Sequence, residues 1–489
     1  MFRVMPRVGR VQATDEARSY GRRASLLSIG VGITGLITYL YFAIASHELS
    51  KDQYGEITVL WVSVFIVISV LQRPVEQLLS RTISQNLAQG TPIRHTVRVA
   101  ATIQVSVALA FDVLAIALRD PIQNNLLHGN STLYWIGVAA VTAYGASYFA
   151  RGFLAGSHRL TIYALQIICE SVARTAFPTA VAIGIASGQT VVALGIVAAP
   201  TLSLIVVPFA FFRRFGGDSE PAAADRSGLT AAAGDGPEGT PGESRAEGPS
   251  PGDAATTDEF TLARGGRFAG AVFLIMLSEQ TIFNAGNLLV NATTGAAAAG
   301  YVFNVLMIAR APLQLFQAVQ TSLLPHLTTL GSRGEEDDFR ASIRVTVMAI
   351  AGFAGLVALA MLVAGPELMQ IAFGKKHTYQ RADLVAVAVG MGVYLSAATL
   401  NQAALARGQV RRASFCFVGC AIAFVVWVVV PIIPSDVTRV VVGYLGAAVL
   451  LCSLLYWLYR QPLVPKEVPV KPGSTEEMEL QLAAGDEAG

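Results

Sequence analysis

The sequence predicts an all-α integral membrane protein with twelve transmembrane helices in two pseudo-symmetric six-helix lobes around a central cavity. Three observations predict this class. Of the 489 residues, 53% are hydrophobic and only 14% are charged, whereas soluble domains are about one quarter charged. Apolar stretches of roughly 20 residues, the length that crosses a bilayer, recur along the chain. A polar segment without aromatic residues divides these stretches into two sets of six.

The first set follows an arginine-rich segment, residues 1–23, which we expect in the cytoplasm. Residues 24–46 carry no charge and exceed the roughly 7–15 apolar residues of a secretory signal, so we expect a membrane helix there. The 38 uncharged residues from 175 to 212 are too long for one span and are divided at 187–189. The first lobe, residues 24–212, therefore has expected spans at 24–46, 55–80, 97–118, 133–153, 160–186 and 190–212.

A linker at residues 213–263 separates the two lobes. From 216 to 258 it has no aromatic residue and is rich in Gly, Pro, Ala, Asp and Glu. Such a segment cannot bury enough apolar area to offset its ordering entropy, so we expect a disordered cytoplasmic linker. The second lobe, residues 264–460, has expected spans at 267–291, 297–325, 341–364, 384–407, 413–433 and 437–459. Residues 461–489 form an expected cytoplasmic tail.

Basic residues are distributed unevenly over the expected loops. If both termini lie in the cytoplasm, 27 of the 35 Lys and Arg residues fall on the inside and 6 on the outside. Positive residues favour the cytoplasmic side, so we expect a multi-pass protein of a bacterial plasma membrane with both termini inside. Lys375, Lys376 and Arg381 form the one outside group that opposes this distribution.

The two halves also resemble each other in sequence. RPVEQLL at 73–79 ends the second span, and RAPLQLF at 310–316 lies in the eighth; FLAGSHR at 153–159 closes the fourth, and ALARGQVR at 404–411 closes the tenth. Six spans per half make the repeat parallel, related by an axis along the membrane normal. The substrate path is then expected between the lobes. Such helix junctions are also common in membrane proteins, which is the alternative explanation.

Four further motifs, in order, carry a resemblance to a known family. They are LSKDQYG at 49–55, LLP at 323–325, AFGKK at 372–376 and LNQAALARG at 400–408. Over about residues 24–460 the chain resembles the polysaccharide-biosynthesis or oligosaccharide flippases of the multidrug/oligosaccharidyl-lipid/polysaccharide exporter superfamily. The resemblance implies a central cavity lined by helices one, two, seven and eight, with Arg73, Arg81 and Arg310 as its cations. Arg73 and Arg81 are alternatively ordinary cytoplasmic anchors. The long linker departs from the family pattern.

Ionisable residues inside expected spans are few, and such residues usually face a bundle interior or a wet cavity. Glu170 and Arg174 are four residues apart on one helix face, which indicates a self-neutralising pair or an ion-coupling site. Burial raises the pKa of a carboxyl group, so acids in spans are candidates to carry protons. The ion-coupling candidates are Glu279, Asp112, Glu170 and Arg174.

Polar side chains at spacings of three and four form a stripe on each of two expected helices. Amides can bond sugar hydroxyls, and guanidinium groups can bind phosphate bidentately. The stripes therefore suit the lining of a glycan-diphosphate cavity; the alternative is interhelical hydrogen bonding. Matching positions in the repeat predict that Arg73 and Arg310 face each other across the cleft. The expected lining residues are Arg73, Arg81, Gln280, Asn284, Asn287, Asn291, Arg310, Gln314 and Gln317.

The residues favour transport over catalysis. No Gly-rich phosphate loop, His-based metal cluster or nucleophile elbow occurs in the sequence, so we expect no enzyme, metal or cofactor. The net charge of +2 gives no footprint for nucleic acid. We expect a flippase for a lipid-linked oligosaccharide or polysaccharide precursor, with glycosyltransferases or a polymerase of the same pathway as possible partners. The alternatives are an ion-coupled multidrug exporter, a lipid II flippase and a membrane glycan polymerase or glycosyltransferase.

Overall fold

The computed structural model describes residues 30–208, 262–333 and 336–461, and within these ranges every regular element is a helix. The first lobe contains a helix at Gly30–Glu48, then α2 (Lys51–Ala88), α3 (Arg94–Ala117), α4 (Arg119–Leu126), α5 (Ser131–Gly156), α6 (Leu160–Ala182), α7 (Gln189–Ser203) and the short 3-10 helix η1 (Leu204–Val206). The second lobe contains α9 (Leu262–Thr294), α10 (Ala296–Arg333), α11 (Glu336–Phe373), α12 (Arg381–Ala406), α13 (Val410–Val429) and α14 (Asp436–Arg460).

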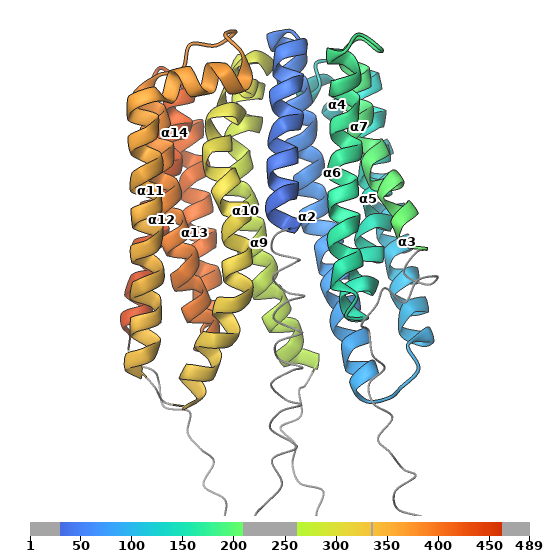
Figure 1. Cartoon of the computed structure of the whole chain (residues 1–489), viewed down its shortest axis with the longest axis vertical. Helices are drawn as coiled ribbons and strands as arrows, with labels where there is room; N and C mark the ends of the chain where they lie inside the picture. Colours follow the sequence, from blue (N-terminus) through green and yellow to red (C-terminus); the bar gives the residue numbers. More distant parts are fainter. Residues whose placement is uncertain (1–29, 209–261, 334–335, 462–489) are drawn as a thin grey trace, which may run out of the picture.

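The predicted fold class is confirmed. Each lobe has six long helices, and Figure 1 shows the lobes side by side with their helices along a common direction. Nine of the described helices are long and apolar enough to cross a membrane, so the chain is a multi-pass membrane protein. The expected segments 1–23, 213–263 and 461–489 lie almost entirely outside the described residues, so their domain boundaries stay predictions.

Two local features differ from the expected pattern of spans. The short helix α4 follows α3 directly, where the sequence indicated only a loop. The helices α2 and α10 each run for 38 residues, well beyond the spans expected at 55–80 and 297–325. The expected division near 187–189 is confirmed, because α6 ends at Ala182 and α7 begins after Gly188, whose φ of 88° is unfavourable for other residues.

The lobes meet along α2, with α9 and α10 packed against it from the second lobe. Ser50 begins α2 with a capping box, because its side chain accepts from the Gln53 backbone and the Gln53 side chain bonds back. Close to this end α2 crosses α10 at Gly55 and Gly300. A Cβ on Gly55 would lie 1.9 Å from the carbonyl oxygen of Ala296, so only glycine allows this approach.

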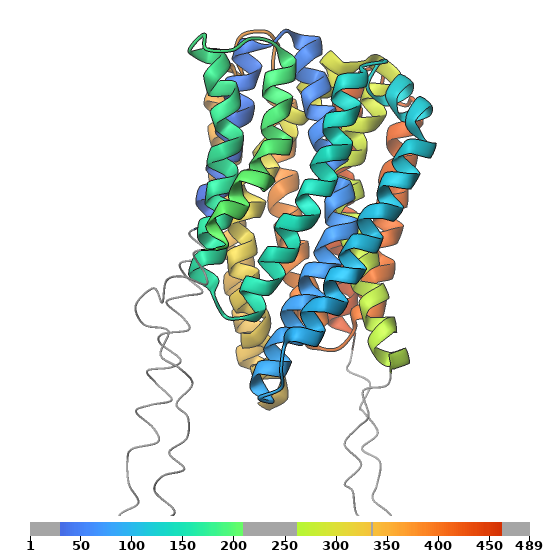
Figure 2. The ribbon, with the colours of Figure 1, turned by 90° about the vertical axis from the view of Figure 1, so that its right-hand side faces the viewer.

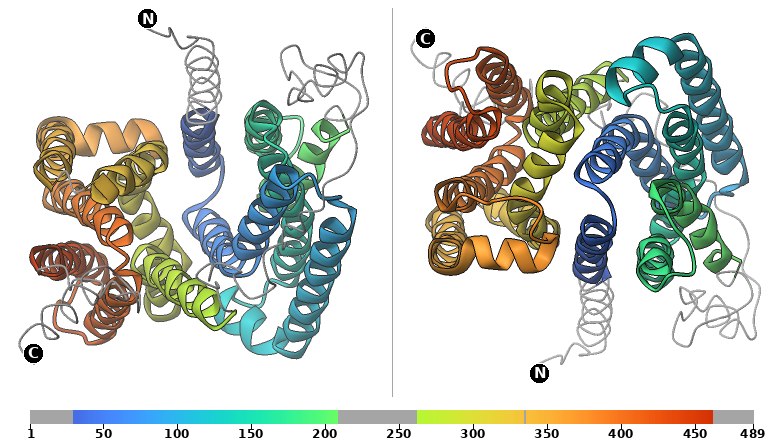
Figure 3. Two further views of the ribbon diagram at one scale, coloured as in Figure 1. Left: turned by 90° about the horizontal axis from the view of Figure 1, so that it is seen from below. Right: turned by 90° about the horizontal axis from the view of Figure 1, so that it is seen from above.

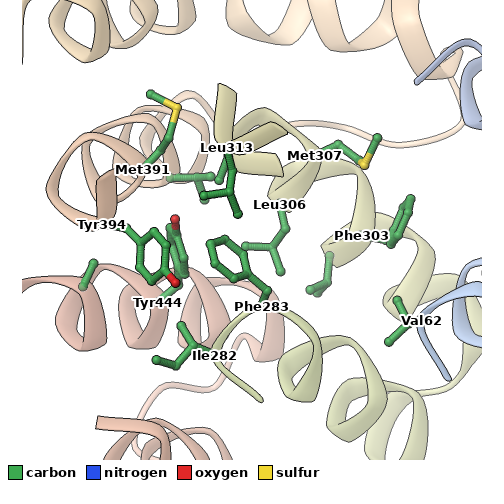
Figure 4. Close-up of a cluster of buried hydrophobic side chains, with 14 of the residues drawn as sticks. Val62, Ile282, Phe283, Phe303, Leu306, Met307, Leu313, Met391, Tyr394 and Tyr444 are labelled. Atoms are coloured by element: carbon green, nitrogen blue, oxygen red, sulfur yellow. The ribbon is translucent and has the colours of Figure 1, made fainter. Parts of the chain in front are cut away.

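Aromatic and aliphatic side chains fill the space behind this crossing. Phe283 of α9 packs edge-on against Tyr394 of α12, with ring centroids 4.7 Å apart, and lies 5.6 Å from the Tyr444 ring of α14. Figure 4 shows these three rings beside Leu306 of α10. Across the lobe boundary, the ring centroids of Phe42 and Phe303 lie 4.5 Å apart. The hydrophobic core is thus continuous between the lobes at this level.

The two lobes are joined at one end of the bundle. Contacts between them include the Gly55–Gly300 crossing, the Phe42–Phe303 ring contact and a hydrogen bond from the Tyr54 hydroxyl to Asn304. Figure 1 shows α2 and α10 together at this end and apart at the other. Seen along the bundle in Figure 3, the helix at 30–48 stands between the lobes beside α10.

Candidate functional site

The region where α2 faces α9 and α10 contains three of the charged residues singled out in the sequence. Arg73 lies on α2, Glu279 on α9 and Arg310 on α10, and each keeps part of its surface accessible although it lies within the bundle. Long side chains with charged tips in such positions are costly unless they are paired or hydrated. This cluster is the candidate functional site.

Arg310 is held in place by α9. Its guanidinium group donates to the backbone oxygen of Phe283 at 2.9 Å and to Oδ1 of Asn284 at 2.8 Å. The guanidinium carbon also lies 4.8 Å from the centroid of the Phe303 ring, a cation–π contact. Its buried Nε atom has no hydrogen-bond partner, and among the described residues no carboxylate pairs with it. Arg310 therefore retains a charge without an acidic partner and a buried donor without an acceptor.

Glu279 and Arg73 form a second part of the cluster, and it joins the two lobes. The Tyr394 hydroxyl donates a hydrogen bond to Glu279, and Arg73 lies within electrostatic range of that carboxylate. Arg73 also interacts with the Tyr148 hydroxyl and lies 5.9 Å from the Phe65 ring centroid. Opposite charges thus approach each other from α2 and α9.

The sequence repeat does not place Arg73 and Arg310 at the same depth. Arg73 lies 18 residues beyond Gly55, whereas Arg310 lies 10 residues beyond Gly300, where the two helices cross. At about 1.5 Å per residue, Arg73 is therefore roughly 12 Å deeper along the helix axis. This offset does not favour the expected face-to-face pair, which stays a prediction. The two aligned motifs lie on corresponding helices of the two lobes, but at different distances from the point where these helices cross.

The polar stripe on α9 is divided between two roles. Asn287 donates to the backbone oxygen of Ala299 at 2.6 Å, and Asn291 donates to that of Leu126 in the other lobe at 2.9 Å. Both side chains are buried, so in this conformation they connect helices, as in the alternative interpretation. Gln280 and Asn284 bond each other at 2.9 Å, next to Arg310. Asn284 is also buried, whereas Gln280 is partly exposed, so only Gln280 is accessible for a lining role in this conformation.

A separate ionic network lies inside the first lobe. Glu170 accepts from Arg174 at 3.0 Å and forms a second, shorter ion pair with Arg151 of α5, and all three residues are buried. Arg174 also donates to the Tyr144 hydroxyl at 2.8 Å. The sequence did not single out Arg151, although its position inside an expected span was a signal that it needs an acidic partner. One carboxylate here compensates two guanidinium groups.

Glu76 and Tyr163 extend this network towards α2. The Tyr163 hydroxyl of α6 donates to Oε1 of Glu76 at 3.0 Å, and Arg151 lies within electrostatic range of the same carboxylate. Glu76 lies three residues beyond Arg73 on α2. Charges thus continue from the interior of the first lobe to the lobe boundary.

The remaining sequence candidates lie elsewhere. Asp112 accepts from the Thr142 hydroxyl at 3.0 Å and lies on α3, which Figure 2 shows at the outer edge of the first lobe. Arg81 is exposed near the end of α2. Gln314 and Gln317 lie on α10, but their side chains are outside the described part. Among the described residues, no group of three or more His, Cys, Asp or Glu could hold a metal ion.

Solved structures with a similar helix arrangement include those of membrane transporters. The eukaryotic MATE transporter AtDTX14 is 11% identical and superposes with a TM-score of 0.59 over 90% of this chain and 95% of its own. The Vibrio cholerae MATE transporter VcmN, solved as a point mutant, is 14% identical, with a TM-score of 0.55 over 90% and 97%. The fold of this chain is that of the MATE transporters. Neither a protein-family profile nor a curated protein sequence matches the chain.

The MATE-like fold occurs in more than one conformation among these structures. An inward-facing structure of a multidrug resistance MATE family transporter of the MOP superfamily is 12% identical, with a TM-score of 0.56 over 89% of this chain and 97% of that chain. An outward-facing structure described in the same words is 12% identical, with a TM-score of 0.53 over 90% and 94%. These likenesses show the fold alone, and they do not distinguish the polysaccharide branch expected from the sequence motifs.

Proposed function

We propose that this protein is an alternating-access exporter that moves an anionic, lipid-linked oligosaccharide or polysaccharide precursor across the plasma membrane. The MATE-like fold supports the transport mechanism. The cargo is inferred from the chemistry of the lobe boundary, where the site residues come from both lobes. A cargo bound there changes its contacts whenever the lobes move relative to each other.

The observation that carries the proposal is the environment of Arg310. Its guanidinium group is oriented by Phe283 and Asn284, and its Nε atom is unpartnered. Glu279 and Glu76 both lie within electrostatic range of Arg73, whereas among the described residues no carboxylate pairs with Arg310. A phosphate group accepts charge-assisted hydrogen bonds from guanidinium, and the partly exposed amide of Gln280 lies nearby for a sugar hydroxyl. This arrangement favours an anionic head group.

The conformation described corresponds to one state of such a cycle. The lobes are joined at the end that holds the Gly55–Gly300 crossing. The distribution of basic residues predicts that this end faces outward, so we propose that the structure represents the inward-facing state. Thr91 lies exposed at the opposite end. Thr91→Cys should react with a membrane-impermeant thiol reagent only in opened cells, and Lys375→Cys in intact cells; the reverse pattern would invert the proposed orientation.

A second candidate is an ion-coupled exporter of cationic compounds. The solved structures described as multidrug resistance transporters favour it. So does Glu279, a carboxylate that accepts a hydrogen bond from Tyr394, whose ring packs against that of Phe283. In that case the cargo would contact Glu279, and Arg73 would act as its counter-charge when no cargo is bound.

Binding measurements with two probes separate these candidates. The purified protein is titrated with a polyprenyl diphosphate carrying a short glycan and with a lipophilic quaternary cation. We expect the diphosphate to bind, and Arg310→Ala to weaken its binding about tenfold or more, because a hydrogen bond to an ionised group contributes about 1.5–3 kcal/mol. Arg310→Lys should bind better than Arg310→Ala. The second candidate would be favoured if the protein binds the quaternary cation and not the diphosphate, and if this binding is lost in Glu279→Gln and kept in Arg310→Ala.

A further inference from the structure

The AFGKK segment at 372–376 crosses from the second lobe to the first. Ala364 has non-helical torsion angles, two residues before Pro366, and bends α11 there. Beyond the bend, the helix runs across the end of the second lobe towards the helix at 30–48, as Figures 1 and 3 show. Phe373 is buried, and its ring centroid lies 5.2 Å from that of Tyr39. The segment thus delivers the next residues to the first lobe.

Lys376 ends this segment with its ammonium group on the first lobe. Nζ donates to the backbone oxygens of Ser46 at 2.8 Å, His47 at 2.7 Å and Leu49 at 2.5 Å. An ammonium group has three donors and no acceptor, so its hydrogen-bonding capacity is filled by one turn of backbone. The left-handed conformation of Gly374, with φ of 78°, turns the chain just before this contact.

The carbonyl groups of Ser46 and His47 belong to the C-terminal end of the helix at 30–48, and that of Leu49 follows directly after it. The last carbonyl groups of a helix have no partner within it, and the helix dipole places a partial negative charge there. Only Leu49 and Ser50 separate this helix from α2, so no long loop is present to satisfy the carbonyl groups. A cation from the other lobe therefore completes the end of this helix.

We propose that Lys376 is an inter-lobe latch, which caps the first helix while the lobes are joined and must be withdrawn when this end opens. The proposal rests on the alternating-access mechanism proposed above. The latch lies outermost, beyond the Tyr54–Asn304 hydrogen bond and the Phe42–Phe303 ring contact. When the lobes separate, the carbonyl groups and the ammonium group must both be hydrated again, so the latch favours the joined state.

The neighbouring Lys375 provides a matched comparison. Its side chain is exposed, whereas Lys376 is partly buried. Both are positive residues on the expected outer side, where the topology rule disfavours them. If Lys376 helps to hold the lobes together, a cation is needed at this position for a reason unrelated to membrane insertion.

The test measures the distance between the lobes and needs no substrate. Spin labels are attached to Ile185→Cys in the first lobe and Ile432→Cys in the second, in full-length protein whose four native cysteines are replaced. Both isoleucines are exposed in connections at the joined end. Double electron–electron resonance in lipid nanodiscs then gives the distance between the two labels in protein with Lys376 and in Lys376→Met. This substitution keeps an apolar side chain but removes the ammonium group. Lys375→Met is the control for the loss of one charge.

We expect Lys376→Met to raise the ratio of separated to joined lobes about tenfold, a change equivalent to about 1.4 kcal/mol. This is less than three buried charge-assisted bonds would give, because the contact is partly exposed. Lys375→Met should leave the ratio unchanged. If the two variants behave alike, whether both shift or neither does, the latch is refuted. If Lys376→Met does not fold, Lys376→Gln is measured against the same control, with the same expected shift and the same refuting result. Because no cargo is present, failure of the cargo proposal leaves this result unaffected.

Discussion

Replacement of Glu170 by Gln distinguishes a structural network from an ion-coupling site. Glu170 is only 4% exposed and pairs with Arg151 and Arg174, which are also buried. In Glu170→Gln, both guanidinium groups lose their shared carboxylate while still surrounded by protein. Removing one partner of a buried ion pair destabilises a protein by about 3–5 kcal/mol. We therefore expect Glu170→Gln to unfold at a clearly lower temperature than the unchanged protein.

The exposed pair of Glu367 and Arg381 provides the control. Their side chains are 59% and 55% exposed, with N and O atoms 3.3 Å apart, and such surface pairs contribute about 0–1 kcal/mol. Glu367→Gln should therefore unfold almost as the unchanged protein does. Adding Arg174→Met to Glu170→Gln removes an uncompensated charge and should recover part of the lost stability, because Arg151 still has Glu76 within electrostatic range.

Thermal unfolding of the purified protein in detergent, followed by the loss of its monodisperse fraction, provides the comparison. If Glu170→Gln is as stable as Glu367→Gln, the network does not need its carboxylate. Glu170 would then return as a candidate for ion coupling, the other interpretation of its pairing with Arg174.

Two further predictions concern the joined end of the lobes. Gly55→Ala should lower thermal stability and separate the lobes, because its Cβ would lie 1.9 Å from the α10 backbone. Gly270→Ala should be neutral, because no atom lies within 4 Å of a Cβ at that position. Equal unfolding temperatures for the two variants would contradict the close crossing. Burial and the charges of Lys51 and Lys376 lower the pKa of His377; separation of the lobes removes Lys51, so the open state binds the proton more readily. The joined state should therefore become less favoured as pH falls below about 6.5, and inter-lobe distances measured over this pH range would show the change. If the same pH response persists in His377→Gln, His377 is not its cause.

The groups around His377 make this sign unambiguous. Its ring lies 5.4 Å from that of Tyr301 and 6.3 Å from that of Tyr379 by their centroids, both of which are uncharged at these pH values. Two acids act on its neighbours, Glu48 on Lys376 and Asp383 on Tyr301, but the charges that act on His377 itself are those of Lys51 and Lys376. A protonated His377 therefore meets mainly cations while the lobes are joined.

The arrangement of spans was predictable from sequence because it depends on local composition. A membrane helix needs a continuous apolar stretch of known length, so the two sets of six helices were visible without tertiary information. The division before α7 was likewise indicated by Ser187 and Gly188. The length of α2 and α10 was not, because polar residues continue these helices beyond the apolar stretch.

The site was only partly predictable because its contacts join distant parts of the chain. The sequence located Glu279 and Arg310 as charges within spans, but Arg151 as the second partner of Glu170 depends on how α5 packs against α6. The expectation that Arg73 and Arg310 face each other assumed that they lie at the same depth on α2 and α10. Their relative depth is instead set by where these helices cross, at Gly55 and Gly300. Likewise, the amide spacing on α9 was equally compatible with a lining and with helix packing.

The central claim is that the lobe boundary carries an anionic, lipid-linked glycan across the membrane. Its most direct test is transport by the purified protein in vesicles, with a fluorescent polyprenyl-diphosphate glycan placed in one leaflet and its appearance in the other followed by a membrane-impermeant quencher. We expect translocation by the unchanged protein, a loss of about tenfold or more in Arg310→Ala, consistent with one charge-assisted hydrogen bond, and partial activity in Arg310→Lys. Translocation in Arg310→Ala at the unchanged rate, or no translocation of the glycan by vesicles that do export a lipophilic cation, would contradict the account.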